Sequence, residues 1–354
     1  MSLNQHSRIS ILIVGGTGAQ GGAIARILAR TGRFDIRILT RSAASSAAQE
    51  LAALPNVELV TGANESETDV DNALRNIQAV YLNTNGFATG IKNETYTGIR
   101  IFELARRAGV KHFIYAGLDY LGPLTNYNDK YAAGHYEGKG RVVSFIQSQP
   151  KSPMAWTNIL SGPYAEMLFE TLGPKYDAEK DLYVFAAPLH DGSLPMIHLD
   201  DLAKYVLWAL DHRSQSNGLT FGAATEHVTW AHLVASFVRL TRKKAVYYDI
   251  PLPEWIQAAF GAKASTKIGS GIAPENDESL QTFSEDFTKW WELYRSAGPS
   301  VGGDGQGIIK RDYAFLDHIL PDRIKSIGEW MSKVGYDGSP RKLLSVPEGK
   351  NRLE

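Results

Sequence analysis

A histidine and a lysine stand four residues apart, at positions 135 and 139. On an α-helix this spacing places the imidazole of His135 and the ammonium of Lys139 on one face. An imidazole titrates near neutral pH, so His135 can act as a general acid. The alternative interpretation is that His135 only packs or forms hydrogen bonds, while Lys139 holds a ligand. Both interpretations require a helix at this point of the chain.

A glycine-rich turn near the N-terminus is a second candidate site. It follows the apolar run Ile11 to Val14 and begins a helical pattern, which is the context in which such glycines bind a dinucleotide. Gly15 allows the tight turn, Gly18 lets the backbone approach a pyrophosphate, and Gly21 permits close packing of helix and strand. The first amides of the helix then face the anion. A purely structural turn is the alternative.

The end of the second predicted strand indicates which dinucleotide is bound. An acidic residue there binds the ribose 2′-hydroxyl of NAD, whereas an arginine accepts the 2′-phosphate of NADP. Asp35 precedes the strand Ile36–Thr40 and therefore lies at the wrong edge of the sheet. Arg41 and Ser42 follow the strand, and the guanidinium can bind a phosphate in bidentate fashion. The pattern favours NADP(H), with a solvated Arg41 at a helix start as the alternative.

The elements that must position these residues show a regular alternation. Short β-rich runs and amphipathic stretches of helical length alternate from Ile9 to about Ile159. This alternation predicts an α/β fold, a doubly wound parallel Rossmann sheet whose strands are buried on both faces. The predicted strands are Ile9–Val14, Ile36–Thr40, Val57–Thr61, Ala79–Asn83, His112–Ala116 and Met154–Ile159. The predicted helices lie near Ala19–Arg30, Ala44–Ala53, Glu67–Leu74, Tyr96–Ala108 and Tyr131–Gln149.

Beyond Pro163 the rhythm loosens into helix-rich segments with short strands, such as Thr220–Gly222 and Ala245–Tyr248. We expect a Rossmann domain over residues 1–160 and a smaller, helix-rich substrate lobe over residues 161–354, with some segments returning to the sheet. Two glycine-rich stretches, 268–272 and 298–307, are interpreted as mobile surface loops.

An aromatic stretch of near-helical periodicity lies between these two loops. Its first interpretation is packing of the lobe. The alternative is a lid that offers an apolar wall to a bulky aromatic substrate. Its members are Phe283, Phe287, Trp290, Trp291 and Tyr294.

Composition narrows the function further. The chain has 37 basic and 38 acidic side chains among 354 residues, so no strongly basic surface for nucleic acid is expected. The absence of cysteine removes disulfides, thiolate metal sites and cysteine nucleophiles. No apolar run of about 18 residues and no signal-like start occur, which predicts a chain without membrane contact. We expect it in the cytoplasm, with the nucleus as the alternative.

No metal site is predicted. The remaining histidines lack the spacing that places two ligands on one helix. Asp200 and Asp201 follow His198 closely, but the apolar run that begins at Leu202 favours a helix cap, made by Asp201, over a carboxylate pair.

Four motifs resemble the NmrA-like branch of the atypical short-chain dehydrogenases/reductases. The resemblance covers most of residues 8–260, and the segment from Lys263 to just before Asp322 has no counterpart in it. It implies a Rossmann domain that binds NADP(H) and a small C-terminal lobe that closes a cleft over the nicotinamide. The motifs are Val14 to Gly21, Leu39-Thr40-Arg41, Tyr115-Ala116-Gly117-Leu118 and His135 to Gly140.

The resemblance also implies roles for individual residues. Arg41 and Ser42 would bind the 2′-phosphate, and Lys139 would lie near the ribose and nicotinamide. Contacts to the pyrophosphate would come from Gly15, Thr17, Gly18, Ala19, Gln20 and Gly21. The remaining cofactor contacts would be Asn83, Thr84 and Asn85 after the fourth strand, and Pro163 and Tyr164 after the sixth, where they border the substrate cleft.

The catalytic residues are less well defined by this resemblance. Typical members of the wider superfamily carry a tyrosine four residues before the lysine, and this chain has His135 there. The candidates for catalysis are Lys139, His135 and Tyr120, the last being one of several tyrosines nearby. Tyr127, three residues before Lys130, is another phenol that a helix would pair with a lysine.

Two functions follow from these features. The preferred hypothesis is an NADP(H)-dependent oxidoreductase that transfers a hydride between nicotinamide and a carbonyl, imine or activated alkene of a bulky small molecule. The missing phenol favours the alternative, a non-catalytic NADP(H) sensor that acts through protein contacts. A protein partner or a second copy of the chain is therefore a further expected partner.

Overall fold

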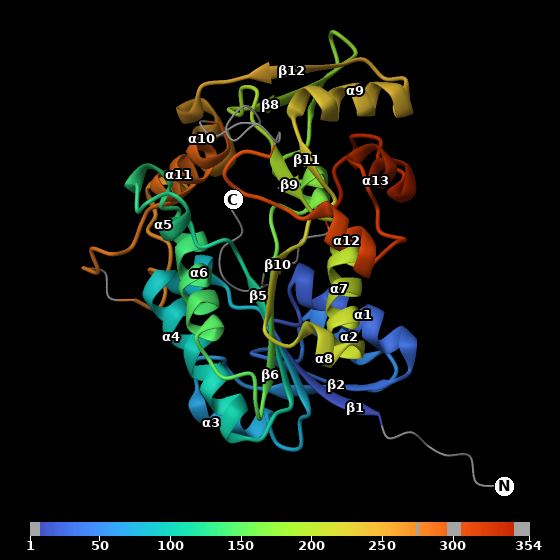
Figure 1. Cartoon of the computed structure of the whole chain (residues 1–354). Coiled ribbons are helices and arrows are strands. Elements are labelled where there is room, and N and C mark those ends of the chain that lie inside the picture. The colour runs from blue at the N-terminus through green and yellow to red at the C-terminus, as the bar shows by residue number, and fades with distance from the viewer. Residues whose placement is uncertain (1–7, 274–275, 296–305, 343–354) are drawn as a thin grey trace, which may run out of the picture.

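A seven-stranded parallel sheet forms the centre of the chain in a computed structural model that describes residues 8–273, 276–295 and 306–342. The strand order is β10-β6-β5-β4-β1-β2-β3 (Figure 1). The strands are β1 (Ile9–Val14), β2 (Phe34–Thr40), β3 (Val57–Thr61), β4 (Ala79–Leu82), β5 (His112–Gly117), β6 (Ala155–Leu160) and β10 (Leu219–Gly222). The order reverses between β1 and β4, and at such a switch point the carboxyl ends of parallel strands leave a crevice for a ligand.

Both faces of this sheet are covered, which explains the continuous apolar runs. Side chains alternate along a strand, so Ile11 and Ile13 pack with one layer of helices, and Leu12 and Val14 pack with the other. One layer contains α1 (Ala19–Thr31), α2 (Ser46–Ala52) and α7 (Leu199–Asp211). The other contains α3 (Glu67–Ala73), α4 (Gly86–Arg107) and α6 (Gly134–Gln147).

The predicted doubly wound fold is confirmed, and two helix starts were wrong. Helix α4 begins at Gly86, ten residues before the predicted start at Tyr96, and Gly90 interrupts it with φ 75° and ψ 168°. Helix α6 begins at Gly134 because the chain before it forms the short 3-10 helix η1 (Asp129–Tyr131), whose first turn is capped by Asn128. Strand β2 begins at Phe34, so Asp35 lies inside the strand, at its amino end.

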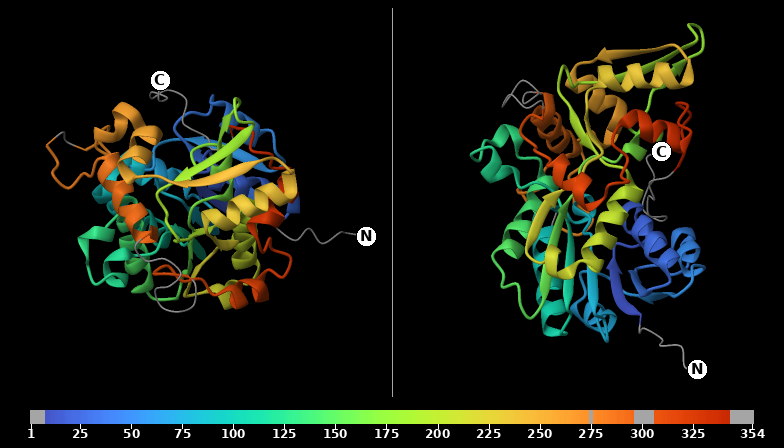
Figure 2. Two further views of the ribbon diagram at one scale, coloured as in Figure 1. Left: turned by 90° about the horizontal axis from the view of Figure 1, so that it is seen from above. Right: turned by 45° about the vertical axis from the view of Figure 1, so that its right-hand side comes forward.

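Beyond the sheet and the helices on its two faces, a further group of elements covers the edge at which the parallel strands end (Figures 1 and 2). We refer to this group as the second layer. It contains two small sheets, β12-β8-β7 and β11-β9, and its own apolar core. The strands are β7 (Lys175–Asp177), β8 (Leu182–Ala187), β9 (Leu194–Met196), β11 (Glu226–Val228) and β12 (Ala245–Asp249). The helices are α9 (Trp230–Thr241), α10 (Leu252–Phe260), α11 (Phe283–Arg295) and α13 (Ile327–Val334), and the short turns are α5 (Leu121–Leu124), η2 (Ala165–Phe169) and η3 (Gly261–Ser265). Helix α12 (Tyr313–Ile319) instead packs into the core beside α7, and the turn α8 (Arg213–Ser216) connects α7 to β10.

The chain crosses between the central sheet and the second layer more than once. After β9 it returns to the sheet through α7 and β10, and β10 pairs in parallel with β6. The division into domains at residue 160 thus stays a prediction. None of the described helices is both long and apolar enough to cross a membrane.

Two further local predictions were wrong. Asp201 does not cap α7, because its carboxylate binds Lys204 at 3.0 Å and accepts the Ile324 N–H at 2.7 Å, while Glu166 accepts the first N–H of the helix, that of Leu199, at 3.2 Å. The stretch 268–272 is no simple surface loop, because Ile268 is buried and donates its N–H to Gln281 O at 2.8 Å. The stretch 298–307 lies outside the described residues except for its last two positions.

Candidate functional site

The glycine turn has the geometry that a phosphate-binding turn requires. Gly15 adopts φ +80°, which favours glycine, and a Cβ on Gly21 would collide with the Gly15 carbonyl. Gly18 is the N-cap residue of α1, where no side chain caps the helix and no acidic residue occupies the first turn. The amides and the positive end of the helix dipole are therefore available to an anion.

The loop after β4 lies directly against this turn. Asn83 donates its N–H to Val14 O at 3.1 Å, and a Cβ on Gly15 would lie 2.5 Å from Asn83 O. Thr84 is buried and Asn85 is exposed. The structure thus brings the residues predicted to bind the pyrophosphate and the predicted Asn83-Thr84-Asn85 loop to one crevice, at the switch point of the sheet.

Arg41 and Ser42 are exposed at the carboxyl end of β2. Asp35 lies at the opposite end of this strand, opposite Ser10 of β1, and forms an ion pair with Arg8 at 3.4 Å. The structure therefore places a cation, and not a carboxylate, where a Rossmann fold meets the adenosine ribose.

Lys139 reaches from α6 to the loop after β4. Its Nζ donates to Thr84 O at 2.8 Å, Asn83 Oδ1 at 3.0 Å and Thr84 Oγ1 at 3.1 Å. It also lies 3.3 Å from Glu94 Oε1 of α4. Burial lowers the pKa of Lys139, and the nearby Glu94 carboxylate opposes that shift.

His135 lies one turn before Lys139 and binds a carboxylate from the second layer. Its Nδ1 lies 2.6 Å from Oδ2 of Asp286, a fully buried residue of α11. The backbone N–H of His135 donates to Asp286 Oδ1 at 3.1 Å, and Gly134 N–H donates to Gln281 Oε1 at 3.0 Å. Residues from the C-terminal segment thus cap α6, whose own N-cap residue, Ala133, has no side chain that can do so.

Aromatic rings surround this histidine. The ring centroid of Phe87, in the first turn of α4, lies 4.9 Å from that of His135 and 5.8 Å from that of Phe287. Phe283 lies 6.2 Å from Phe87, and Phe87 is 39% exposed. The predicted aromatic helix is confirmed as α11. Trp290, Trp291 and Tyr294 are buried in the core, whereas Phe283 and Phe287 line the outer side next to Phe87.

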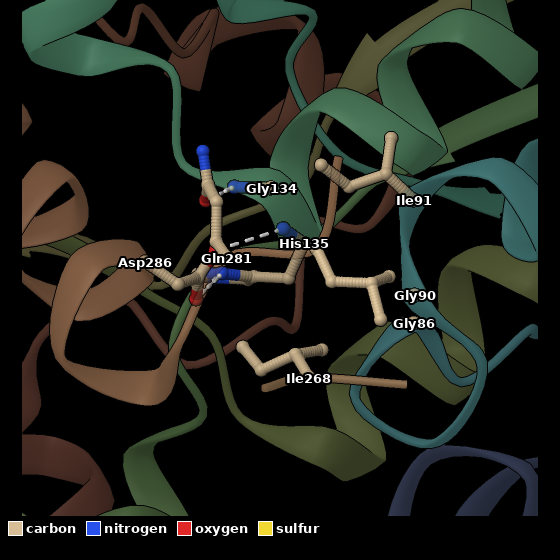
Figure 3. A pocket seen from close by; sticks show the side chains of 9 residues that line it. Gly86, Gly90, Ile91, Gly134, His135, Ile268, Gln281 and Asp286 are labelled. Carbon is tan, nitrogen blue, oxygen red and sulfur yellow. Dashed lines mark hydrogen bonds and ion pairs between the residues drawn. The ribbon is translucent and has the colours of Figure 1, made fainter. Parts of the chain in front are cut away.

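A small pocket opens beside His135 (Figure 3). Its interior volume is about 10 Å³, enough for about one water molecule and far less than a bulky ligand needs. Figure 3 shows Gln281 and Asp286 pointing from the C-terminal segment toward the start of α6. The lining residues are Gly86, Gly90, Ile91, Gly134, His135, Ile268, Leu280, Gln281 and Asp286.

The other predicted residues lie around this crevice in different ways. Pro163 is buried after β6, and Tyr164, partly buried, forms a bridge with Ile197. Burial raises the pKa of the Tyr164 phenol above its ordinary value.

Tyr120 packs against Gly140, one residue beyond Lys139, where a Cβ would lie 2.6 Å from the Tyr120 Cα. Tyr127 is 73% exposed with φ 56°, so it does not share a helix face with Lys130.

Two residues of this region were missed by sequence reasoning. Glu94 stands in the polar run Lys92-Asn93-Glu94-Thr95, which carries no sign of burial. Asp286 lies in the first turn of α11, where an acidic residue is ordinary. The signal for Asp286 was only the aromatic helix itself, which marked a buried face in that segment.

Comparison with known proteins gives this geometry a context. The sequence profile of the NmrA-like family matches residues 7–295, which extends past Lys263 and includes α11. The chain is 26% identical over 251 residues to an NmrA-like family domain-containing protein of Dictyostelium discoideum, covering 69% of this chain and 82% of that protein. It is 27% identical over 256 residues to the NmrA-like family domain-containing oxidoreductase himF of Aspergillus japonicus, covering 69% and 76%.

Solved structures share the fold at low identity. NmrA, a negative transcriptional regulator crystallised with NAD, has a TM-score of 0.69 at 18% identity and covers 93% of this chain and 96% of its own. The NADPH-dependent quinone oxidoreductase QOR2 of Escherichia coli, crystallised with NADPH, has a TM-score of 0.62 at 18% identity and covers 92% and 99%. With the match of the profile to most of the chain, these findings show that the protein belongs to the NmrA-like family.

Proposed function

We propose that this chain is an NADP(H)-dependent oxidoreductase. The observation that carries the proposal is the position of Lys139, whose ammonium is held on the loop after β4, next to the glycine turn. Relatives named as oxidoreductases and a similar fold crystallised with NADPH support it.

The residues present fit the dinucleotide. The uncapped start of α1 suits the pyrophosphate, with Thr17, Ala19 and Gln20 beside the three glycines. Arg41 and Ser42 would hold the 2′-phosphate, which favours NADP(H) over NAD(H). Asn83, Thr84, Asn85 and Lys139 would border the nicotinamide ribose, with Pro163 and Tyr164 beyond them. When bound, the cofactor supplies the hydride.

The protein would then supply the proton and the orientation. Asp286 accepts a hydrogen bond from Nδ1–H of His135, which leaves Nε2 as the nitrogen that exchanges a proton with the substrate. Tyr120 remains the competing donor, and Lys139 would hold the ribose.

The substrate class follows from the rings beside this histidine. Phe87, Phe283 and Phe287 offer an apolar aromatic surface next to His135. Such a surface favours a planar aromatic compound with a reducible carbonyl, imine or alkene. The small pocket at His135 would have to widen for it, which movement of α11 can provide.

Loss of NADPH absorbance at 340 nm with a panel of aromatic quinones, ketones and imines tests the function. We expect turnover with at least one of them, and a large loss in a Lys139→Met variant that still folds. Tight NADPH binding without turnover across the whole panel would contradict the proposal that the chain is an enzyme.

A cofactor sensor is the second candidate, favoured by the replacement of the usual tyrosine by His135. The similarity in fold to NmrA, a negative transcriptional regulator, supports it. Binding of a protein partner, or formation of a dimer, that depends on NADP(H) in a chain without turnover would establish this function.

A further inference from the structure

Glu94 is a buried carboxylate to which the proposed chemistry gives no role. It lies in α4 with a fully buried side chain, and its Oε1 accepts the hydroxyl of Thr84 at 2.8 Å and lies 3.3 Å from Lys139 Nζ. We propose that Glu94 is a positioning residue, which keeps Lys139 charged and directed at the nicotinamide ribose. This inference rests on the proposed function, since it concerns the lysine of the same site.

The backbone around Glu94 is shaped to admit the carboxylate. A Cβ on Gly86, at the start of α4, would collide with Glu94 Oε2, and a Cβ on Gly138 of α6 would lie 2.6 Å from the same oxygen. Any side chain at these two positions would therefore displace the carboxylate. Glu94 Oε2 has no hydrogen-bond partner among the described residues. No hydrogen bond to that oxygen therefore holds the carboxylate in place.

The energetics explain why a carboxylate is needed there. Burial disfavours the charged form of an amine, and the pKa of Lys139 is lowered for this reason. Of the groups that face Lys139, Asn83 and Thr84 are neutral, and the Tyr115 ring of β5 lies 5.7 Å from Nζ. Among the described residues, Glu94 is thus the carboxylate that pairs with this ammonium. The carboxylate of Asp286 is bound instead to His135, one turn away on α6.

The first experiment measures Lys139 directly in the chain without cofactor. The ¹³Cε resonance of Lys139, assigned by its loss in Lys139→Met, is titrated in wild type and in Glu94→Gln. We expect the midpoint to fall by about one pH unit or more in Glu94→Gln, and by less in Glu94→Asp, which keeps the charge. Glu103→Gln, which removes a carboxylate on the outer side of the same helix, should leave it unchanged. An equal midpoint in wild type and folded Glu94→Gln would overturn the inference.

The second experiment follows the effect on cofactor binding. The Kd for NADPH is measured by tryptophan fluorescence between pH 6 and pH 10. In Glu94→Gln the pH at which affinity falls should move down with the Lys139 midpoint, and this shift should vanish in a Lys139→Met background. A merely structural loss would weaken binding by one factor at every pH and would contradict the positioning role. Absence of NADPH binding in wild type would defeat the proposed function, while the first experiment still decides the Glu94–Lys139 coupling.

Discussion

Nδ1 of His135 lies 2.6 Å from Oδ2 of Asp286, across 151 residues of chain. The contact joins the helix that carries Lys139 to the aromatic helix α11 of the second layer. Because the same carboxylate also accepts the backbone N–H of His135, it fixes both the start of α6 and the orientation of the imidazole. Asp286 therefore connects the C-terminal segment to the imidazole that would transfer the proton in the proposed function.

Replacement of Asp286 by Asn tests this relationship. An amide can still accept the N–H of His135, but the substitution removes the negative charge that faces the imidazole. We expect kcat with an active quinone or ketone to fall roughly 100-fold near pH 7, with an unchanged Kd for NADPH. The measurements are steady-state kinetics at 340 nm and calorimetry.

Glu285→Gln is the matched control, since Glu285 is the neighbouring acidic residue and contacts Thr282 at the start of the same helix. An Asp286→Asn variant with the kcat of the control would assign Asp286 to capping of α6 alone.

Substitution of Arg41 by Asp should reverse the preference between the two dinucleotides. The new carboxylate repels the 2′-phosphate of NADPH and can accept the ribose 2′-hydroxyl of NADH. We expect the Kd for NADPH to rise at least tenfold, with little change for NADH. Arg30→Asp changes another exposed arginine, at the far end of α1, and should alter neither Kd. Equal weakening for both dinucleotides would refute the 2′-phosphate role.

The strands of the first half were predictable because burial on both faces demands continuous apolar runs, as in Ile11 to Val14. The glycine turn was predictable because its three glycines perform local steric tasks. The start of α4 was not, because the residues from Gly86 to Thr95 show little apolar periodicity and Gly90 breaks the helix. The fold class of the NmrA-like family was thus predictable from local pattern.

The partners of the site residues depend on contacts that sequence spacing does not encode. Asp286 reaches His135 only after α11 docks on α6, and Glu94 is buried only because Gly86 and Gly138 leave it room. Asp201 has the residue type and place of a helix cap, yet tertiary contacts to Lys204 and Ile324 engage its carboxylate. Long-range packing decided each of these outcomes.

A buried ion pair joins the two layers and should be important for stability. Arg311 donates to Asp119 Oδ1 at 3.0 Å and to Oδ2 at 2.8 Å, and it also donates to Ser161 O at 3.0 Å. Asp119→Asn leaves the guanidinium buried without its counter-charge. We therefore expect the free energy of unfolding, measured with urea, to fall by about 3 kcal/mol. Asp312→Ala, which removes the exposed N-cap of α12 near by, should lower it by about 1 kcal/mol. A loss for Asp119→Asn no greater than this would show that the pair is not stabilising.

Stability should fall in mild acid because of a buried histidine. The side chain of His112 is 2% exposed and forms one hydrogen bond, between Nε2 and Thr157 Oγ1, at 2.9 Å. Burial lowers the pKa of His112 from 6.5 to about 4. Between these two values the unfolded chain binds a proton that the folded chain does not, so stability is lost as pH falls through that window. The loss from this residue approaches about 3 kcal/mol at pH 4.

Urea unfolding between pH 7 and pH 4 measures this loss in wild type and in His112→Gln. The variant should show a shallower decline, whereas the exposed His318→Gln should follow wild type. Parallel curves for wild type and His112→Gln would contradict the assignment to His112.

The most direct test of the whole account is an isothermal titration of the folded chain with NADPH. If the start of α1 and the loop after β4 bind the dinucleotide, one molecule binds per chain with a Kd in the micromolar range, and Gly21→Val, whose side chain would collide with the Gly15 carbonyl, abolishes the heat. No heat with NADPH, NADP⁺, NADH or NAD⁺ would contradict the account.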